Sequence, residues 1–393
     1  MSKKFIIPEE LKEVKLKAIQ AIGKIRPADN NTRADKDFLF KAQRTDASRS
    51  LPEYYLIYFL FVDLLGFKNL GQFEKVAWSI PIDFEGEAFL LEHRKFGVGV
   101  FAHDASTQKV QAEQIVRFIN KGIKVATPFF DWLANQAVLD SKLNVVNKGP
   151  SLFDRFEFFI CQYKKMNAKA VKKAKDRIVK VKKLKNGVTA TSIRYPANEI
   201  RRRADWLALA SIDAFFSWTE HIFIHIAILS GKINTGIEVS NLAEGDWQTK
   251  FKKALDVQEK KMKIFFDELV IIRRQLRNFI AHGAFGKGGE AFSFHSGVGA
   301  VPVILQPNHN HSLLQEFIFD EARAVEVIEG FVAYLWSGNL EPARLYIQES
   351  NLPLILTMTK DGSYLKAMKS TENMKVLIND LHHRFDQFAN MDF

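Results

Sequence analysis

The fold of this chain is decided by one stretch, which reads IIRRQLRNFIAHG from Ile271 to Gly283. With the residues before it, this stretch places apolar side chains at spacings of three and four, which predicts one buried face of a helix. Arginines lie off that face, and Gly283 stands where a glycine commonly ends a helix. We therefore expect a helical segment from Asp246 to His282, in one or two pieces. Its core stripe is Phe265, Leu269, Ile272, Leu276 and Phe279.

A second long helix precedes this segment. Pro196 suits the first turn of a helix, and the helical pattern continues to about Ser230. Between Ala214 and Gly231 two faces are apolar, which predicts burial on both sides, in a core or against a second subunit. Polar residues leave fewer than ~20 uncharged apolar positions, so we expect a buried helix and no membrane span. These residues are Glu220, His221 and His225, and we expect both histidines to be core or interface residues.

The stretch resembles the motif of the HEPN superfamily, a group of helical ribonucleases found in toxin–antitoxin, CRISPR and phage-defence systems. In that family an arginine is followed, after four to six residues, by a histidine. Arg277 and His282 have this spacing, Asn278 follows the arginine, and Ala281 precedes the histidine, as in many members. Glu220 is similar to the acid that the family's first helix often carries. The resemblance covers roughly Ala197–Gly283, with the helix after Asp320 as a further candidate.

The resemblance implies a HEPN-like helical bundle whose cleft is shared across a two-fold homodimer. It also implies a ribonuclease that needs no metal or cofactor, acting as a toxin or a phage-defence effector. Such an effector would have RNA as its substrate and a neutralising antitoxin or defence-system protein as a further partner.

Elementary chemistry agrees with this expectation. RNA is cleaved without metal when its 2′-OH attacks the adjacent phosphorus, which requires proton transfer and a cation for the developing negative charge. Histidine transfers protons near neutral pH, and the guanidinium fork of arginine matches phosphate. Arg277 and His282 lie ~140° apart around a helix and ~7.5 Å apart along it. Helix stability does not explain that spacing.

The expected roles follow from these properties. His282 would act as general acid and base, Arg277 would stabilise the pentavalent phosphate, and Asn278 would orient either residue or bind the RNA backbone. Glu220 would set the electrostatics of the site by pairing with Arg277, His282 or a basic group across the interface. The alternatives are a purely structural ion pair at Glu220 and a histidine that only favours the helix dipole.

Positive charge is concentrated in one segment of a chain whose formal net charge is +11. Between Lys164 and Lys185, eleven lysines and arginines accompany one acid, Asp176. Such a segment attracts polyanions, of which RNA is the expected one, whereas a solvated linker is the alternative. Lys164–Asp176 is expected to be helical, and Ile178–Tyr195 to form a hairpin turning at Asn186-Gly187. The candidate RNA-binding residues are Lys172, Lys173, Lys180, Lys182, Lys183, Arg273 and Arg274.

The remaining segments complete a mainly α fold with a smaller α+β N-terminal unit. At the N-terminus we expect helices at Pro8–Ile22, Leu51–Leu65, Gln108–Ile123 and Pro128–Leu139, a loop at Arg26–Ser50, and a hairpin of Ala77–Phe84 with Ala88–Phe101. Towards the C-terminus we expect a polar break at Gly231–Gly245, a hairpin within Ala291–Leu305, a helix capped by Asp320 and two final helices. The expected domains are 1–160, a basic connecting segment 161–195, a HEPN-like domain 196–340 and C-terminal helices 341–393.

Other signals are weaker. Cys161 is the one cysteine, which excludes an intrachain disulfide and a cysteine-based zinc site, and it is expected to be buried. Asp83 with Glu92-His93-Arg94-Lys95 loosely resembles the metal-dependent site of restriction-type nucleases. His309-Asn310-His311 is expected to be solvated. The N-terminus lacks a signal-peptide core, which suggests a soluble cytoplasmic protein.

The competing function is a non-catalytic HEPN-like dimeric scaffold or nucleic-acid-binding protein. Both functions use the dimer and the basic segment. They differ in whether Arg277 and His282 face one accessible cleft.

Overall fold

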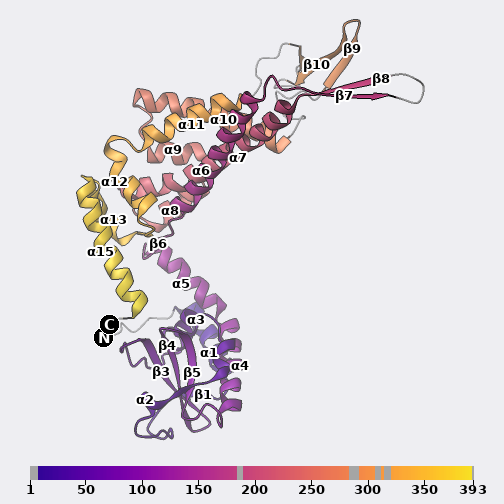
Figure 1. The fold of residues 1–393 in the computed structure, drawn as a ribbon. Coiled ribbons are helices and arrows are strands. Elements are labelled where there is room, and N and C mark those ends of the chain that lie inside the picture. The colour runs from indigo at the N-terminus through magenta and orange to yellow at the C-terminus, as the bar shows by residue number, and fades with distance from the viewer. Residues whose placement is uncertain (1–7, 184–188, 283–291, 306–310, 314–319, 392–393) are drawn as a thin grey trace. The chain divides into compact units, whose positions relative to one another are not determined.

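The computed structural model of this chain describes residues 8–183, 189–282, 292–305, 311–313 and 320–391, with the side chains of 277–282, 292–293, 302, 304–305 and 311–312 excepted. Helices account for 61% of the chain and strands for 15%, so the fold is mainly α, as expected. The chain forms two compact units. Unit 1 comprises Met1–Asp140 and Asn379–Phe393, and unit 2 comprises Ser141–Ile378. Their elements are labelled in Figure 1.

Unit 1 is built on a five-stranded antiparallel sheet, in the order β1-β3-β4-β5-β2. The first arm of the expected hairpin, Ala77–Phe84, is present as one strand. The expected second arm, Ala88–Phe101, is two strands, because the chain turns again at Gly97, whose φ of 102° favours glycine. The strands are β1 (Ile25–Pro27), β2 (Gln43–Arg44), β3 (Val76–Phe84), β4 (Glu87–Arg94) and β5 (Gly97–Ala102).

Helices of unit 1 pack on one face of this sheet and form its main core with residues such as Phe61, Phe89 and Ile115. A smaller cluster, which includes Phe38, Leu90 and Phe101, covers the opposite face. The helices are α1 (Lys12–Ala21), α2 (Phe38–Lys41), α3 (Tyr54–Tyr58), which continues as a π-helix (Phe59–Leu64), α4 (Lys109–Val125) and α5 (Thr127–Leu139), with 3-10 turns at Glu9–Leu11 and Asp46–Ser50. The expected helices are therefore confirmed, and short elements interrupt the expected loop.

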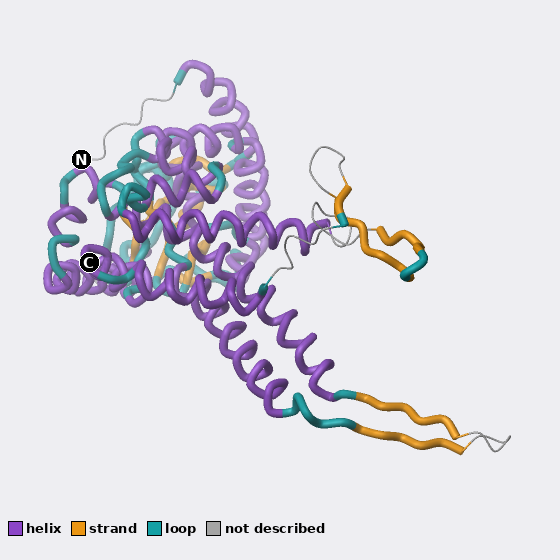
Figure 2. Tube along the Cα trace, turned by 90° about the horizontal axis from the view of Figure 1, so that it is seen from above, coloured by secondary structure: helices purple, strands orange, loops and turns teal. Residues whose placement is uncertain are grey.

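Unit 2 contains two long helices, α6 (Gly149–Lys172) and α7 (Pro196–Leu229), which lie side by side. Between them the chain forms the antiparallel strands β7 (Ile178–Lys183) and β8 (Thr189–Arg194), which extend beyond the helix ends in Figure 2. The hairpin expected at Ile178–Tyr195 is thus confirmed, and its turn lies outside the described residues. The domain boundary expected at residue 160 falls inside α6. The division lies after Asp140 instead, because α6 packs along α7.

The two apolar faces of α7 are covered within one chain. On one side the ring of Trp218 stacks on that of Phe156 of α6, with 6.2 Å between the ring centres. On other sides Phe223 meets Phe251 of α9 (Trp247–Ala254), and Phe215 meets Phe331 of α11 (Glu321–Leu335). A second subunit is therefore not needed to explain the apolar pattern of α7. Within the described residues, α7 alone has the length and composition that could span a membrane, and most of it is buried here.

The rest of unit 2 follows the expectations in part. The segment 246–282 is helical in two pieces, α9 and α10 (Lys260–His282), and Asp320 caps α11 by accepting from the Arg323 N–H. The prediction of a polar break at Gly231–Gly245 was wrong, because this segment contains the helix α8 (Gly236–Glu244). A capping box formed by Thr235 and Glu238 starts that helix. The expected hairpin is β9 (Phe292–Ser296) with β10 (Gly299–Leu305), beside β11 (His311–Ser312).

More elements end the chain than the two helices expected there. They are α12 (Glu341–Arg344) after a 3-10 turn (Gly338–Leu340), a π-helix (Leu345–Glu349), β12 (Leu354–Ile355), α13 (Thr357–Lys360), α14 (Ser363–Ala367) and α15 (Thr371–Asn390). Strand β12 pairs with β6 (Asn144–Val145), which ties this region to the start of unit 2.

Candidate functional site

The expected catalytic residues Arg277, Asn278 and His282 belong to the last turns of α10. Their side chains lie outside those that the structure describes, so the expected cleft between them stays a prediction. The helix before them is described, and its core stripe is confirmed in part: Leu269 is fully buried, Ile272 and Leu276 are nearly so, and Phe265 is half-buried.

Glu220 of α7 forms two ion pairs with cations of neighbouring helices. The Arg273 guanidinium donates to Glu220 Oε1 at 2.6 Å, and Lys250 Nζ of α9 lies 3.6 Å from Oε2. Lys250 is buried, so its ammonium depends on this carboxylate for its charge partner. The expected partners Arg277 and His282 have side chains outside those that the structure describes, so that pairing stays a prediction. The two described partners come from the same chain, and one is Arg273, a candidate RNA-binding residue. The structural ion pair weighed as the alternative describes this arrangement.

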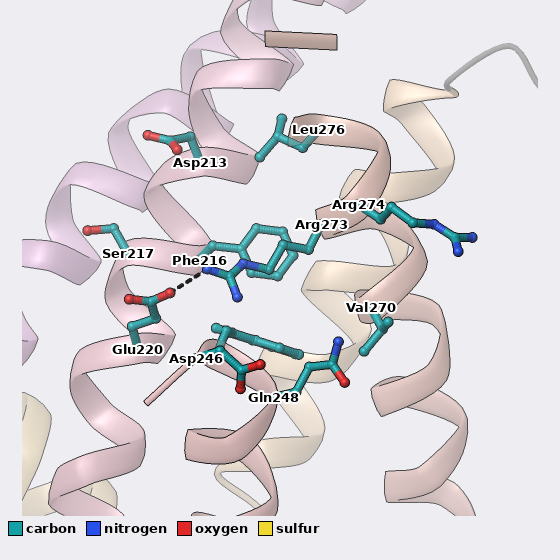
Figure 3. A pocket seen from close by; sticks show the side chains of 11 residues that line it. Asp213, Phe216, Ser217, Glu220, Asp246, Gln248, Val270, Arg273, Arg274 and Leu276 are labelled. Carbon is teal, nitrogen blue, oxygen red and sulfur yellow. Dashed lines mark hydrogen bonds and ion pairs between the residues drawn. The ribbon is translucent and has the colours of Figure 1, made fainter. Parts of the chain in front are cut away.

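These groups border a cavity of about 850 Å³ between α7, the start of α9, and α10. In Figure 3 the side chains of Arg273 and Glu220 approach each other across this space. Acids and guanidiniums alternate with aromatic and aliphatic groups along its walls. The lining residues are Asp213, Phe216, Ser217, Glu220, Asp246, Trp247, Gln248, Val270, Arg273, Arg274 and Leu276.

An aromatic cluster makes the floor of the cavity rigid. Trp247 is fully buried, and its Nε1–H donates to Thr219 Oγ1 at 2.9 Å. The Arg273 guanidinium carbon lies 5.8 Å and 5.9 Å from the ring centres of Phe216 and Trp247, within cation–π range. Arg273 is therefore fixed both by a carboxylate and by two rings.

The charges at the rim are set by local hydrogen bonds. Asp246 caps α9 by accepting from the Thr249 N–H at 2.7 Å, and the hydrogen bonds from Thr249 lower its pKa. Asp213 and Arg274 are exposed. The cavity thus presents ionised hydrogen-bonding groups over an apolar floor. Within the described part of the chain, no group of three or more His, Cys, Asp or Glu could hold a metal ion.

The α10 residues that line the cavity directly precede the motif in the sequence. Residues four apart on a helix lie on nearly the same face and ~6 Å apart along the axis. Arg277 therefore follows Arg273 on the face of α10 that borders the cavity. Arg273, which pairs with Glu220 of α7, lies one helical turn before the motif.

The candidate RNA-binding residues divide between two places in unit 2. Lys180, Lys182 and Lys183 are exposed on β7, and Lys172 is exposed at the end of α6. Lys173 is half-buried and lies 3.9 Å from Asp176. Arg274 is exposed on α10, whereas Arg273 is half-buried and donates one guanidinium N–H to Glu220.

Sequence reasoning missed the contribution of α9 to the cavity. Lys250 and Trp247 carry no motif, and they stand in a short helix whose sequence is mostly polar. One signal was available, because Asp246 precedes Trp247 as an N-cap residue that marks the start of a helix. The partner of a buried tryptophan or lysine, by contrast, is not encoded locally.

The metal-dependent alternative is not supported by its geometry. Glu92 is buried, accepts from Ser79 Oγ at 2.7 Å and pairs with Arg94. Glu92 lies opposite Ser79 in the sheet, whereas Asp83 lies opposite Ala88. Four residues along β3 separate the two acids by ~13 Å, so they do not form one metal site. His309 and Asn310 lie outside the described residues, as does the side chain of His311.

The other candidates have structural roles or none. His225 is buried, and its Nδ1 lies 3.0 Å from the His221 carbonyl oxygen. His221 Nε2 accepts from the Lys148 N–H at 2.9 Å, and burial, followed by the nearby His225 and Lys148, lowers the pKa of His221 to about 3. His225 is therefore a core histidine, as expected, whereas His221 is half-buried. Cys161 is exposed, contrary to expectation, because it lies next to the buried stripe of α6 formed by Ile160 and Tyr163.

No family model, curated protein or solved structure matches this chain. The HEPN resemblance therefore depends on the motif residues and on the helices that carry them.

Proposed function

We propose that this chain is a metal-independent RNA endonuclease of the HEPN type. The observation that carries the proposal is the position of the Arg277–His282 motif at the end of α10, one turn beyond the charged cavity of Glu220, Arg273 and Arg274. In this proposal the cavity and the motif form one continuous surface for RNA.

The proposed reaction has two proton transfers. His282 accepts the proton of the 2′-OH as its oxygen attacks the adjacent phosphorus. Protonated His282 then donates a proton to the 5′ oxygen as the bond between phosphorus and that oxygen breaks. Arg277 stabilises the charge that develops on the phosphate oxygens through its planar fork of donors. Asn278 orients one of these groups or binds the RNA backbone. The products are a 2′,3′-cyclic phosphate and a 5′-OH.

Glu220 is a positioning residue in this proposal. Its carboxylate holds Arg273 at 2.6 Å and Lys250 at 3.6 Å, and thereby joins α7, α9 and α10 next to the motif. Arg274 and the lysines of the basic segment raise the local concentration of RNA through their charge. We further propose that the protein is a cytoplasmic homodimer and acts as a toxin or phage-defence effector with a neutralising partner.

The competing candidate is a nucleic-acid-binding protein without catalysis. The basic segment favours it, because exposed lysines bind polyanions whether or not a catalytic group is present.

Purified wild-type protein incubated with single-stranded RNA distinguishes the two functions. We expect cleavage that persists in EDTA and leaves a 2′,3′-cyclic phosphate, with no cleavage of DNA or of RNA 2′-O-methylated at the scissile position. His282→Ala should reduce the rate by ~10²–10⁴-fold. Arg277→Lys should also cleave RNA much more slowly than the wild type, because an ammonium does not reproduce the guanidinium fork.

His383→Ala, which removes an exposed histidine of α15, is the matched control and should cleave as the wild type does. Circular dichroism would establish that each variant is folded. Folded wild type that leaves every RNA intact would contradict the proposal, as would a reaction stopped by EDTA.

A further inference from the structure

The ribbon of β7 and β8 is a free-standing element. Each strand is six residues long, and every residue of both strands is exposed. The two strands form a sheet of their own, paired with no other described strand. In Figure 2 they continue from the ends of α6 and α7, away from the helices. Both faces of the ribbon are therefore open to a partner.

The side chains on one face of the ribbon are explained by the stability that they give to the ribbon itself. Val179 lies opposite Ile193, and Val181 lies opposite Thr191. Directly opposed β-branched side chains stabilise an antiparallel pair, and an isolated hairpin in water needs such pairs because it is otherwise marginal. Lys183, opposite Thr189, lies at one end of this mainly aliphatic face.

The other face is basic and has no structural explanation. Lys180 lies opposite Ser192, and Lys182 lies opposite Ala190. Neither described strand contains an acid, and no carboxylate partner is recorded for either lysine within the described residues. Small residues across the ribbon leave both long side chains free to extend. Exposed lysines of α6, namely Lys165, Lys169 and Lys172, continue the positive charge beside the ribbon.

We propose that this ribbon binds double-stranded DNA by inserting its basic face into the major groove. The major groove of B-form DNA, ~12 Å wide and ~8.5 Å deep, admits a two-stranded ribbon. The major groove of A-form RNA is deep and too narrow to be read by side chains. Six residues of strand span ~20 Å, the length of about six base pairs. Ser192 and Ala190 allow close approach to the base edges, and the α6 lysines contact flanking phosphates.

This DNA site goes beyond the proposed RNA cleavage and does not use Arg277 or His282. Charge alone attracts single-stranded RNA as well as DNA, whereas the shape of the ribbon distinguishes the two kinds of duplex. Both proposals use the lysines of the ribbon for attraction by charge, but only RNA cleavage uses Arg277 and His282. Loss of RNA cleavage and loss of DNA binding are therefore distinguishable measurements.

Fluorescence anisotropy with the full-length protein tests the proposal. The probes are a 20-base-pair DNA duplex and the 2′-O-methyl RNA duplex of the same sequence, which is A-form and resists cleavage. We expect the DNA duplex to bind about tenfold more tightly or better, since its major groove alone accepts the ribbon. Netropsin, which fills the minor groove, should not displace the protein.

The ribbon variant Lys180→Gln/Lys182→Gln should lower the DNA affinity by about tenfold and reduce the slope of log K against log salt by about two, since each phosphate contact contributes ~0.9. The matched control Lys360→Gln/Lys366→Gln removes the same charge from exposed positions of α13 and α14, and should bind as the wild type does. Equal affinity for the RNA duplex, displacement by netropsin, or an equal loss in the control variant would overturn the proposal.

Discussion

Glu220 shows how a single carboxylate can organise three helices. Its two cations differ in exposure, because the Lys250 side chain is 8% exposed whereas that of Arg273 is 36% exposed. Removing the carboxylate charge would leave Lys250 buried without a charge partner, which is costlier than leaving an exposed cation. We infer that the pair contributes to the position of α10 relative to α7.

A double-mutant cycle of Glu220→Gln and Arg273→Ala measures this pair. Urea unfolding should give a loss of ~1–2 kcal/mol for each single variant and a coupling free energy of about 1 kcal/mol, since the pair is only partly exposed. The exposed pair Lys263–Asp267 on the same helix is the control, and its coupling should be no more than ~0.5 kcal/mol. Equal coupling in the two cycles would contradict a structural role for Glu220.

The sequence indicated that Glu220 needs a cation but not which one. A charge in a helix that is apolar on two faces must find a partner. The partner that it finds depends on how α9 and α10 pack, and the pattern of α7 does not contain that information. The core stripe of α10 is a pattern within one helix, and the sequence predicted its buried residues Leu269, Ile272 and Leu276. The role of Lys250 depends on how α9 packs, and the sequence did not indicate it.

At the scale of elements, the start of α6 is joined to the C-terminal part of α7 through His221. The Lys148 N–H, at the N-cap of α6, donates to His221 Nε2. The imidazole must be neutral to accept this hydrogen bond. A protonated His221 would also place a positive charge at the positive end of a helix dipole, which is unfavourable.

The free energy of unfolding should therefore fall as the pH falls. The pKa of His221 is lowered to about 3 in the fold, and an unfolded histidine titrates near 6.5. Between these values the unfolded chain binds the extra proton, so stability is full above pH ~6.5 and declines towards pH 3. His221→Gln should remove ~1–2 kcal/mol of this decline between pH 6.5 and 4.5, measured by urea unfolding.

The buried His225, whose pKa is also lowered by burial, should continue to titrate in the His221→Gln variant, so part of the decline remains. His383→Gln, at an exposed position, is the control and should keep the wild-type pH dependence. An unchanged slope in His221→Gln would mean that this histidine is not the link between the two helices.

Periodic patterns predicted elements well where they were long. The length of α7, the two pieces α9 and α10, and the ribbon all follow from spacing, proline and capping signals in the sequence. Short elements were missed where the local signal is a single turn. Gly97 splits the expected second strand into β4 and β5, and the Thr235–Glu238 capping box starts α8 inside a segment that reads as polar.

At the scale of the whole molecule, the chain divides after Asp140, and each unit has its own core. The boundary expected at residue 160 was placed where the composition becomes basic. Composition changes along α6 because its exposed side is basic, while its buried side still packs on α7. A domain boundary follows contacts, and a change of charge along one helix does not mark it.

The proposed homodimer needs an interface other than the apolar faces of α7, which are covered within the chain. Light scattering at micromolar concentration should nevertheless give twice the 45.0 kDa chain mass, because the proposed site is composite. A monomer that cleaves RNA would be consistent with the proposed ribonuclease activity but would contradict a cleft shared between two subunits. A monomer without activity would contradict both.

The ribbon also has an evolutionary consequence. Its described strands begin and end beside the neighbouring ends of α6 and α7, and none of their residues is buried. A mutation there changes no core contact, so the stability of the bundle places almost no restriction on the ribbon's sequence or length. Such an appendage can diverge, lengthen or be lost within a lineage while the helices stay the same, and selection on it acts through what it binds.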